Sequence, residues 1–170
     1  LIPPDSLAPF LSTYGDLAAL DVMGSQARQM DSRDSSGDAN GPRSIYGKEV
    51  EAAQAEGRIC NVPYDPAHQV DTFFDLGIGD STSVWFTQTV GCAIHVIDFY
   101  EARNEGLPHY CKMLTDRRYV YGDHHAPHDI EVRELGSGKS RREIAWDLGL
   151  NFRVVPKLPL EDGIHAAQML

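Results

Sequence analysis

The sequence has few cysteines, no long apolar run and no basic excess. Its three cysteines, Cys60, Cys92 and Cys111, are widely spaced and form no CxxC pair. This argues against a disulfide framework and a structural zinc site, and it is typical of a reducing compartment. No apolar run approaches the roughly 20 residues of a membrane-spanning helix, and the first ten residues, "LIPPDSLAPF", lack the pattern of a signal peptide. We therefore expect a soluble, intracellular protein that has no membrane partner.

The net charge of −10 argues against nucleic acid as a partner if the chain is taken as a whole. The charge is unevenly distributed, however. Residues 1–106 hold 6 basic and 16 acidic side chains, whereas residues 107–157 hold 9 basic and 7 acidic ones. A polyanion would therefore meet residues 107–157, and we expect its binding to be weak and sensitive to salt.

Residues 133–142 read "RELGSGKSRR", and their Gly-Lys-Ser is similar to the end of a nucleotide-binding P-loop. A P-loop needs a glycine where this chain has Arg133, and it follows a buried apolar strand that is missing here. A capped helix explains the residues better. Ser140 is a typical N-cap, Glu143 completes a capping box, and Gly149 ends the apolar pattern. We therefore predict a basic loop that leads into a helix.

The chain divides near residue 44. Residues 31–44 are rich in serine, glycine and aspartate and have almost no apolar side chains, which indicates a linker. We assign 1–43 to a poorly patterned N-terminal segment with that linker, and 44–170 to a single folded domain that starts with a helix over 44–57.

Periodicity within the domain predicts three strands in succession and then alternating helices and strands. The expected strands cover 70–76, 81–88 and 92–102, with a glycine-rich turn at 77–80. They are followed by a helix at 107–114, a strand at 117–122, a loop at 123–139, a helix at 140–149, a strand at 151–157 and a helix from 160. The order β-β-β-α-β-α-β-α predicts an α/β, RNase H-like fold, with a mixed five-stranded sheet flanked by helices.

Two acids stand where such a sheet brings carboxylates together. Asp75 ends the apolar "TFFD" strand, and Asp129 follows the fourth strand. The first and fourth strands of this fold are neighbours, so the two carboxylates are expected to converge. Converging carboxylates bind hard divalent cations such as Mg²⁺ or Mn²⁺, and two such ions hydrolyse phosphodiesters. We predict that Asp75 and Asp129 are catalytic, metal-binding residues.

Plainer interpretations of these acids remain. Asp75 is alternatively a cap of the turn at 77–79, and Asp129 an ordinary loop acid, because aspartate is a common turn residue. Asp80 and Asp123 are the substitutes if the wrong acids have been chosen.

The histidine cluster and the strand aromatics also have two interpretations each. His124, His125 and His128 suggest zinc, but no second group of nitrogen or sulfur ligands accompanies them. A partly solvated loop, or support for a carboxylate, is the favoured interpretation. Burial in the core is favoured over base stacking for the aromatic residues at strand positions, namely Trp85, Phe86 and Phe99.

Four motifs in one order resemble a known family. "FFDLGIGDSTSVWF", "HVIDFYEARNEGLPHY", "YGDHHAPHDIEVRELGSGKSR" and "LEDGIHAAQML" are similar to the nuclease domain of the large terminase subunit of tailed bacteriophages. The resemblance covers about residues 44–170. It implies a metal-dependent endonuclease that cuts concatemeric double-stranded DNA in the cytoplasm of the infected bacterial host. It also implies an N-terminal ATPase domain in the intact subunit, and the small terminase subunit and the portal as partners.

The resemblance also assigns individual residues. It implies that Asp75 is the acid of the first strand and Asp129 the second acid of the metal site. The family's third acid lies in a C-terminal helix that this sequence lacks, so we expect a truncated domain, with Asp162 as a possible substitute; Asp162 is alternatively a helix-start acid.

Three basic residues after the second acid complete the hypothesis. We expect Lys139, Arg141 and Arg142 to contact DNA phosphates, with a solvated helix face as the alternative. Another RNase H-like nuclease, such as a resolvase or transposase core, and a docking module without metal chemistry are the competing functions.

Overall fold

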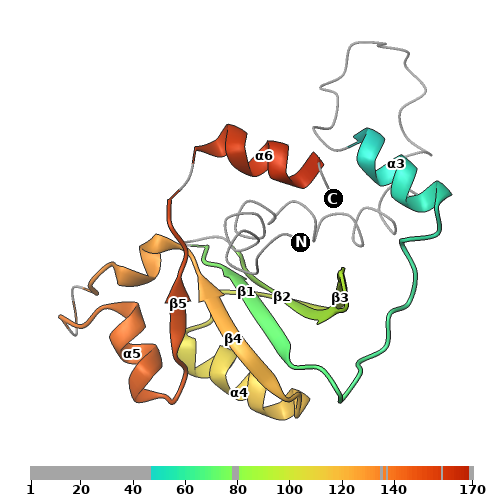
Figure 1. Cartoon of the computed structure of the whole chain (residues 1–170). Coiled ribbons are helices and arrows are strands. Elements are labelled where there is room, and N and C mark those ends of the chain that lie inside the picture. Colours follow the sequence, from blue (N-terminus) through green and yellow to red (C-terminus); the bar gives the residue numbers. More distant parts are fainter. Residues whose placement is uncertain (1–46, 78–80, 135, 137, 158, 169–170) are drawn as a thin grey trace, which may run out of the picture.

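The domain is built on a single mixed sheet. The computed structural model describes residues 47–77, 81–134, 136, 138–157 and 159–168 (Figure 1). The five strands lie in the order β3-β2-β1-β4-β5. The first three are antiparallel neighbours, and β4 and β5 run parallel to β1. Their bounds are β1 Val70–Asp75, β2 Ser81–Val90, β3 Ala93–Arg103, β4 Tyr121–Ala126 and β5 Phe152–Val154.

Helices join the parallel strands, as the RNase H-like prediction required. α4 (Leu107–Arg117) connects β3 to β4, α5 (Arg141–Asp147) precedes β5, and α6 (Leu160–Gln168) follows it. α3 (Gly47–Ala55) precedes the sheet, and a short 3₁₀ helix, His128–Glu131, follows β4. Figure 1 shows α4 and α5 on one side of the sheet and α6 away from them, beyond β5. The predicted fold class is confirmed, and so is the adjacency of the first and fourth strands.

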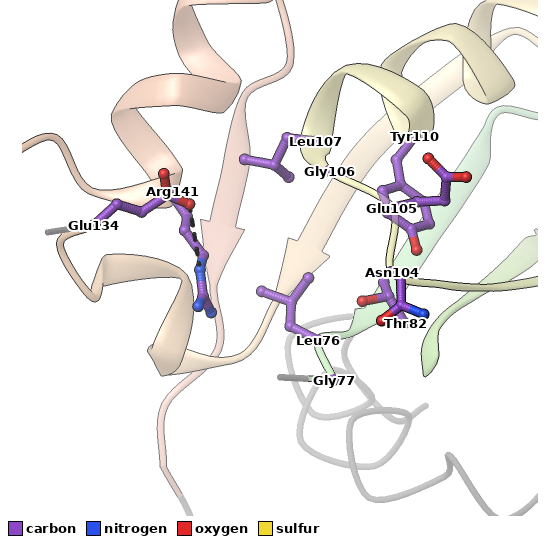
Figure 2. A pocket seen from close by; sticks show the side chains of 10 residues that line it. All are labelled: Leu76, Gly77, Thr82, Asn104, Glu105, Gly106, Leu107, Tyr110, Glu134 and Arg141. Atoms are coloured by element: carbon purple, nitrogen blue, oxygen red, sulfur yellow. Dashed lines mark ion pairs between the residues drawn. The ribbon is translucent and has the colours of Figure 1, made fainter. Parts of the chain in front are cut away.

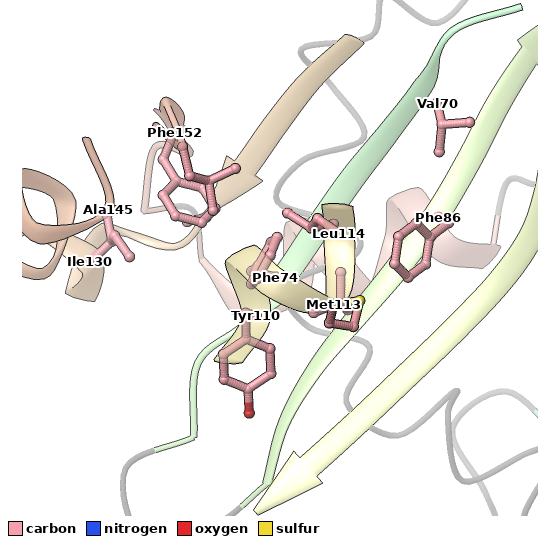
Figure 3. Close-up of a cluster of buried hydrophobic side chains, with 12 residues drawn as sticks. Val70, Phe74, Phe86, Tyr110, Met113, Leu114, Ile130, Ala145 and Phe152 are labelled. Atoms are coloured by element: carbon pink, nitrogen blue, oxygen red, sulfur yellow. The ribbon is translucent and has the colours of Figure 1, made fainter. Parts of the chain in front are cut away.

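One face of the sheet is closed by α4 and α5. Alternate residues of the strands point to this face, because side chains in a strand alternate between the two sides. Phe74 of β1 makes edge contacts with Tyr110 of α4 and Phe152 of β5, with ring centroids 6.2 and 4.9 Å apart (Figure 3). The cluster also contains Val70, Val84, Phe86, Met113, Leu114, Ala126, Ile130, Ala145 and Leu150. It fixes the sheet whose edge carries the two acids.

The aromatic prediction is borne out for two residues of β2. Phe86 is fully buried in the cluster, and Trp85 is buried with its ring 4.6 Å from that of Phe99. Phe99 itself is half-buried.

The fourth strand is shifted from its predicted position. The sequence pattern placed it at 117–122, whereas β4 runs over 121–126. α4 continues to Arg117, and Arg118 ends it in the left-handed conformation, with φ of 54°. Residues 123–126, expected in a loop, therefore form most of the strand. His124 and His125 were expected in the loop because histidine is polar, but both side chains contact residues of β1.

The capped helix is confirmed. The Ser140 side chain accepts a hydrogen bond from the backbone N–H of Glu143, and the Glu143 carboxylate accepts one from the backbone N–H of Ser140. Arg133 and Ser140 form an isolated antiparallel bridge, so the basic stretch is a closed loop. The segment 1–43, the linker and the first residues of the 44–57 helix lie outside the described residues. None of the described helices is long and apolar enough to cross a membrane.

Candidate functional site

The two predicted acids lie at one edge of the sheet. β1 and β4 are parallel neighbours, paired at Thr72 with His124 and at Phe73 with His125. The carboxyl ends of parallel neighbours meet at the same edge. Asp75 is the last residue of β1, and Asp129 lies in the 3₁₀ helix that begins two residues after β4. Both acids therefore lie where neighbouring parallel strands end, and the convergence of their carboxylates stays a prediction.

Asp129 has a buried oxygen that no hydrogen bond satisfies. Its Oδ1 is inaccessible to solvent and has no partner among the described residues. A buried polar atom without a partner costs about 1–3 kcal/mol, and a carboxylate in such a place needs a donor or a cation. The donor chemistry therefore fits a hard divalent cation, which prefers carboxylate oxygens.

The described residues contain no closed metal cluster in this conformation. No three His, Cys, Asp or Glu side chains among them lie together closely enough to hold an ion. The histidines form no zinc group there, and Asp162, in the first turn of α6, forms no third ligand. Asp80, one of the two substitute acids, lies outside the described residues.

The other substitute, Asp123, belongs to a different part of the sheet. It stands between Tyr121, which pairs with Val70, and His124, which pairs with Thr72. Its backbone N–H donates to the Asp71 carboxylate, and its own carboxylate lies 3.0 Å from the Arg153 guanidinium. Asp123 thus contacts the start of β1, whereas Asp75 stands at the end of that strand.

Two histidines of β4 support the sheet beneath the acids. His124 shares a 2.6 Å hydrogen bond with the Thr72 hydroxyl across the β1–β4 pair. Burial lowers the pKa of His124 to about 4, with a further lowering by neighbouring His125 and an opposing effect of Asp123. The His125 ring stacks on Phe73 at 4.6 Å. Both rings therefore belong to the packed sheet, and the solvated-loop interpretation is wrong for them.

Each predicted phosphate-binding cation has a carboxylate neighbour. Lys139 Nζ lies 2.6 Å from Asp147 Oδ2, and this contact raises the pKa of Lys139. Arg142 lies 3.3 Å from Glu131, and Arg141 lies 3.9 Å from Glu134. Ion pairs at a protein surface contribute little to stability, because water and salt screen them. Phosphate groups are therefore able to compete with the carboxylates for these cations.

A cavity opens beside the end of β1. Its volume is about 260 Å³, and its walls come from the end of β1, the start of α4 and the loop before α5. In Figure 2, Leu76 and Gly77 lie between two walls, one formed by Arg141 with Glu134 and the other by Glu105 with Tyr110. Arg141 thus lies on the same side of the molecule as the residues that follow Asp75.

Two polar contacts of His109 hold the wall formed by α4. The Tyr100 hydroxyl lies 2.6 Å from His109 Nε2, and His109 Nδ1 lies 3.5 Å from the Glu105 carboxylate. Since Tyr100 belongs to β3 and His109 to α4, these contacts fix the start of the helix to the sheet.

Sequence reasoning missed two side chains beside the acids. Ser83 is the register partner of Asp75 on β2, and Glu101 is the register partner of Ser83 on β3. The predicted hairpin between β1 and β2 was the signal for Ser83, because it brings position 83 close to position 75. Glu101 also needed the register of β3 on β2, which no short motif shows.

Comparisons with known proteins give structural likenesses only. No protein-family model matches the chain, and no curated protein matches it either. One similar solved structure is the large terminase of a thermophilic bacteriophage, with a TM-score of 0.48, 12% identity, and 62% of this chain aligned to 28% of that one. Another is the PPX-GPPA enzyme of Aquifex aeolicus, with a TM-score of 0.37, 14% identity, and 52% aligned to 36%. Likenesses this low leave the function to the chain's own residues.

Proposed function

We propose that this domain is a metal-dependent DNA endonuclease of the terminase type, which hydrolyses phosphodiester bonds in double-stranded DNA. The observation that carries the proposal is the buried, unpartnered Oδ1 of Asp129 at the sheet edge where β1 ends with Asp75. The order of the four sequence motifs supports the same class.

Asp75 and Asp129 would hold Mg²⁺ or Mn²⁺, two ions in the complete site. Metal ions held there would supply an activated water molecule and stabilisation of the charge on the leaving oxygen. The protein's contribution is positional. The β1–β4 pairing would hold Asp75, at the end of β1, close to the segment after β4 that carries Asp129. The packed rings of His124 and His125 contact β1 across that pairing.

The cations of the loop and α5 would orient the DNA. Lys139, Arg141 and Arg142 would exchange their carboxylate neighbours for phosphates, and such contacts position a duplex without reading its sequence.

We extend the proposal to the partners that the resemblance implies, namely an ATPase domain in the same subunit, the small terminase subunit and the portal, and to the cytoplasm of the infected bacterium.

The decisive experiment is nicking of supercoiled plasmid with Mn²⁺ by Asp75→Asn and Asp129→Asn. Both substitutions keep the shape and remove the charge, so we expect at least about a hundredfold loss of rate with the fold intact by circular dichroism. The matched control is Asp71→Asn, the same change on the same strand four residues away. Full activity in a folded Asp75→Asn protein would refute the assignment.

DNA binding is tested separately from chemistry. The double variant Lys139→Ala with Arg141→Ala should bind duplex DNA more weakly, and its affinity should depend less steeply on salt, by about one unit of slope for each lost phosphate contact. An unchanged slope would assign these residues to a solvated helix face.

Calorimetric titration with Mn²⁺ separates the proposal from a docking module. A docking module should show no binding that depends on Asp75. A resolvase or transposase core would bind metal in the same way, and preferential cleavage of branched DNA over linear duplex would favour that alternative.

A further inference from the structure

A second acid shares the sheet face of Asp75. The β1–β2 register pairs Asp75 with Ser83, and the β2–β3 register pairs Ser83 with Glu101. Directly paired residues point to the same face of a sheet, so the three side chains form a row across three strands. Neighbouring strands lie about 4.8 Å apart, which puts the backbones of Asp75 and Glu101 about 10 Å apart, with only Ser83 between them.

Ser83 is a buried hydroxyl in the middle of this row. The residue is 4% exposed, and its Oγ has no hydrogen-bond partner among the described residues. A buried polar group without a partner costs about 1–3 kcal/mol. The hydroxyl is therefore placed to hold a ligand between Asp75 and Glu101.

Glu101 has the freedom that a ligand role requires. Its side chain is exposed, and no described residue forms an ion pair with it. Its carboxylate is one methylene farther from the backbone than that of an aspartate, so rotation about its side-chain bonds can carry it across Ser83 towards Asp75. This rotation is necessary, because no three-ligand group is closed among the described residues in the present conformation.

We propose that Glu101 is the third metal-binding carboxylate, and that the Ser83 hydroxyl holds an oxygen ligand between it and Asp75. This inference rests on the proposed nuclease function. It places the third ligand on β3, whereas the sequence resemblance had placed it in a C-terminal helix, with Asp162 as the substitute. The metal shell is then built by three elements of one sheet edge, β1, β3 and the segment after β4.

The experiment is Mn²⁺ titration by calorimetry of the 170-residue chain and four variants. Glu101→Gln should weaken Mn²⁺ binding about tenfold or more, since the charge and number of the ligands set affinity for hard cations. Asp162→Asn tests the competing ligand, and Glu51→Gln, an exposed acid of α3, controls for the loss of one charge. Asp75→Asn reports whether the site exists.

The outcomes separate the two hypotheses. If Asp75→Asn does not change Mn²⁺ binding, the proposed function fails. If Asp75→Asn weakens binding but Glu101→Gln behaves like Glu51→Gln, the metal site stands and the third-ligand proposal is overturned. A loss in Asp162→Asn without a loss in Glu101→Gln would move the third ligand to α6.

Ser83→Ala gives a readout that a purely structural role would not change. Removal of an unsatisfied hydroxyl should leave the metal-free midpoint of thermal unfolding unchanged or raise it. The upward shift of that midpoint on adding Mn²⁺ should nevertheless become smaller than in the unaltered chain. An equal Mn²⁺-induced shift in both proteins would exclude Ser83 from the metal shell.

Discussion

The helix-covered face of the sheet and the edge where β1 and β4 end follow opposite rules. On the face, Phe74, Phe152 and their neighbours bury apolar side chains against one another. At the edge, Asp129 and Ser83 bury polar atoms that have no partner among the described residues. Buried polar atoms without partners are expected where a protein keeps a ligand site, and this is why the proposed function is assigned to the edge and not to the helix-covered face.

The largest loss of stability should come from a substitution on the helix-covered face of the sheet. Phe74→Ala removes the ring that contacts both Tyr110 and Phe152, and it should destabilise the domain by about 3–5 kcal/mol. Urea unfolding followed by circular dichroism measures this loss. Phe99→Ala, at a half-buried position of β3, is the comparison and should cost less stability. An equal loss of unfolding free energy in both variants would mean that the buried cluster around Phe74 is no more important to stability than the half-buried position.

The pH dependence of stability should reveal the lowered pKa of His124. Its folded pKa of about 4 lies below its ordinary 6.5, so the unfolded chain takes up the proton first as the pH falls. The free energy of unfolding therefore falls as the pH is lowered from about 6.5 to about 4. Between pH 7 and pH 5 this loss amounts to about 2 kcal/mol.

His124→Gln isolates that contribution, because glutamine does not titrate in this range. The difference in unfolding free energy between pH 7 and pH 5 should shrink by about the same 2 kcal/mol. The same pH dependence in both proteins would mean that His124 is not held neutral by the sheet.

A smaller effect is expected where the basic loop enters α5. Ser140→Ala removes one half of the capping box and should cost about 1 kcal/mol. The cost should appear in thermal unfolding, and Ser140→Asp, which retains the cap, should restore most of it. A neutral Ser140→Ala would mean that packing of Ala145 alone holds the helix.

The smallest effect has the opposite sign and sharpens the comparison most. Asp129→Asn removes a carboxylate charge near a buried, unpartnered oxygen, so stability without metal should stay unchanged or rise by less than about 1 kcal/mol. The same variant should lose Mn²⁺-dependent nicking. A clear loss of stability together with activity would make Asp129 a structural residue rather than a metal ligand.

Much of the fold followed from the sequence because its signals are local. Alternation of apolar side chains located β1, β2 and β3, and Ser140 with Glu143 marked the start of α5. Most of the glycine-rich turn predicted between β1 and β2 lies outside the described residues. The strand order followed from general rules of connection. The main error was β4. Its Gly122 and Asp123 are residue types that are depleted in strands, and its histidines, which contact β1 by stacking and by a hydrogen bond, show no apolar pattern in the sequence.

The sequence by itself determined the sheet, its helices and the placement of Asp75 and Asp129 at strand ends, because periodicity and turn residues act over short distances along the chain. Only the tertiary structure decided which polar atoms are left without partners. The row from Asp75 through Ser83 to Glu101 depends on the register of three strands. The buried oxygen of Asp129 depends on how the segment after β4 packs. Register and burial join residues far apart in the chain, and no short stretch of sequence contains them.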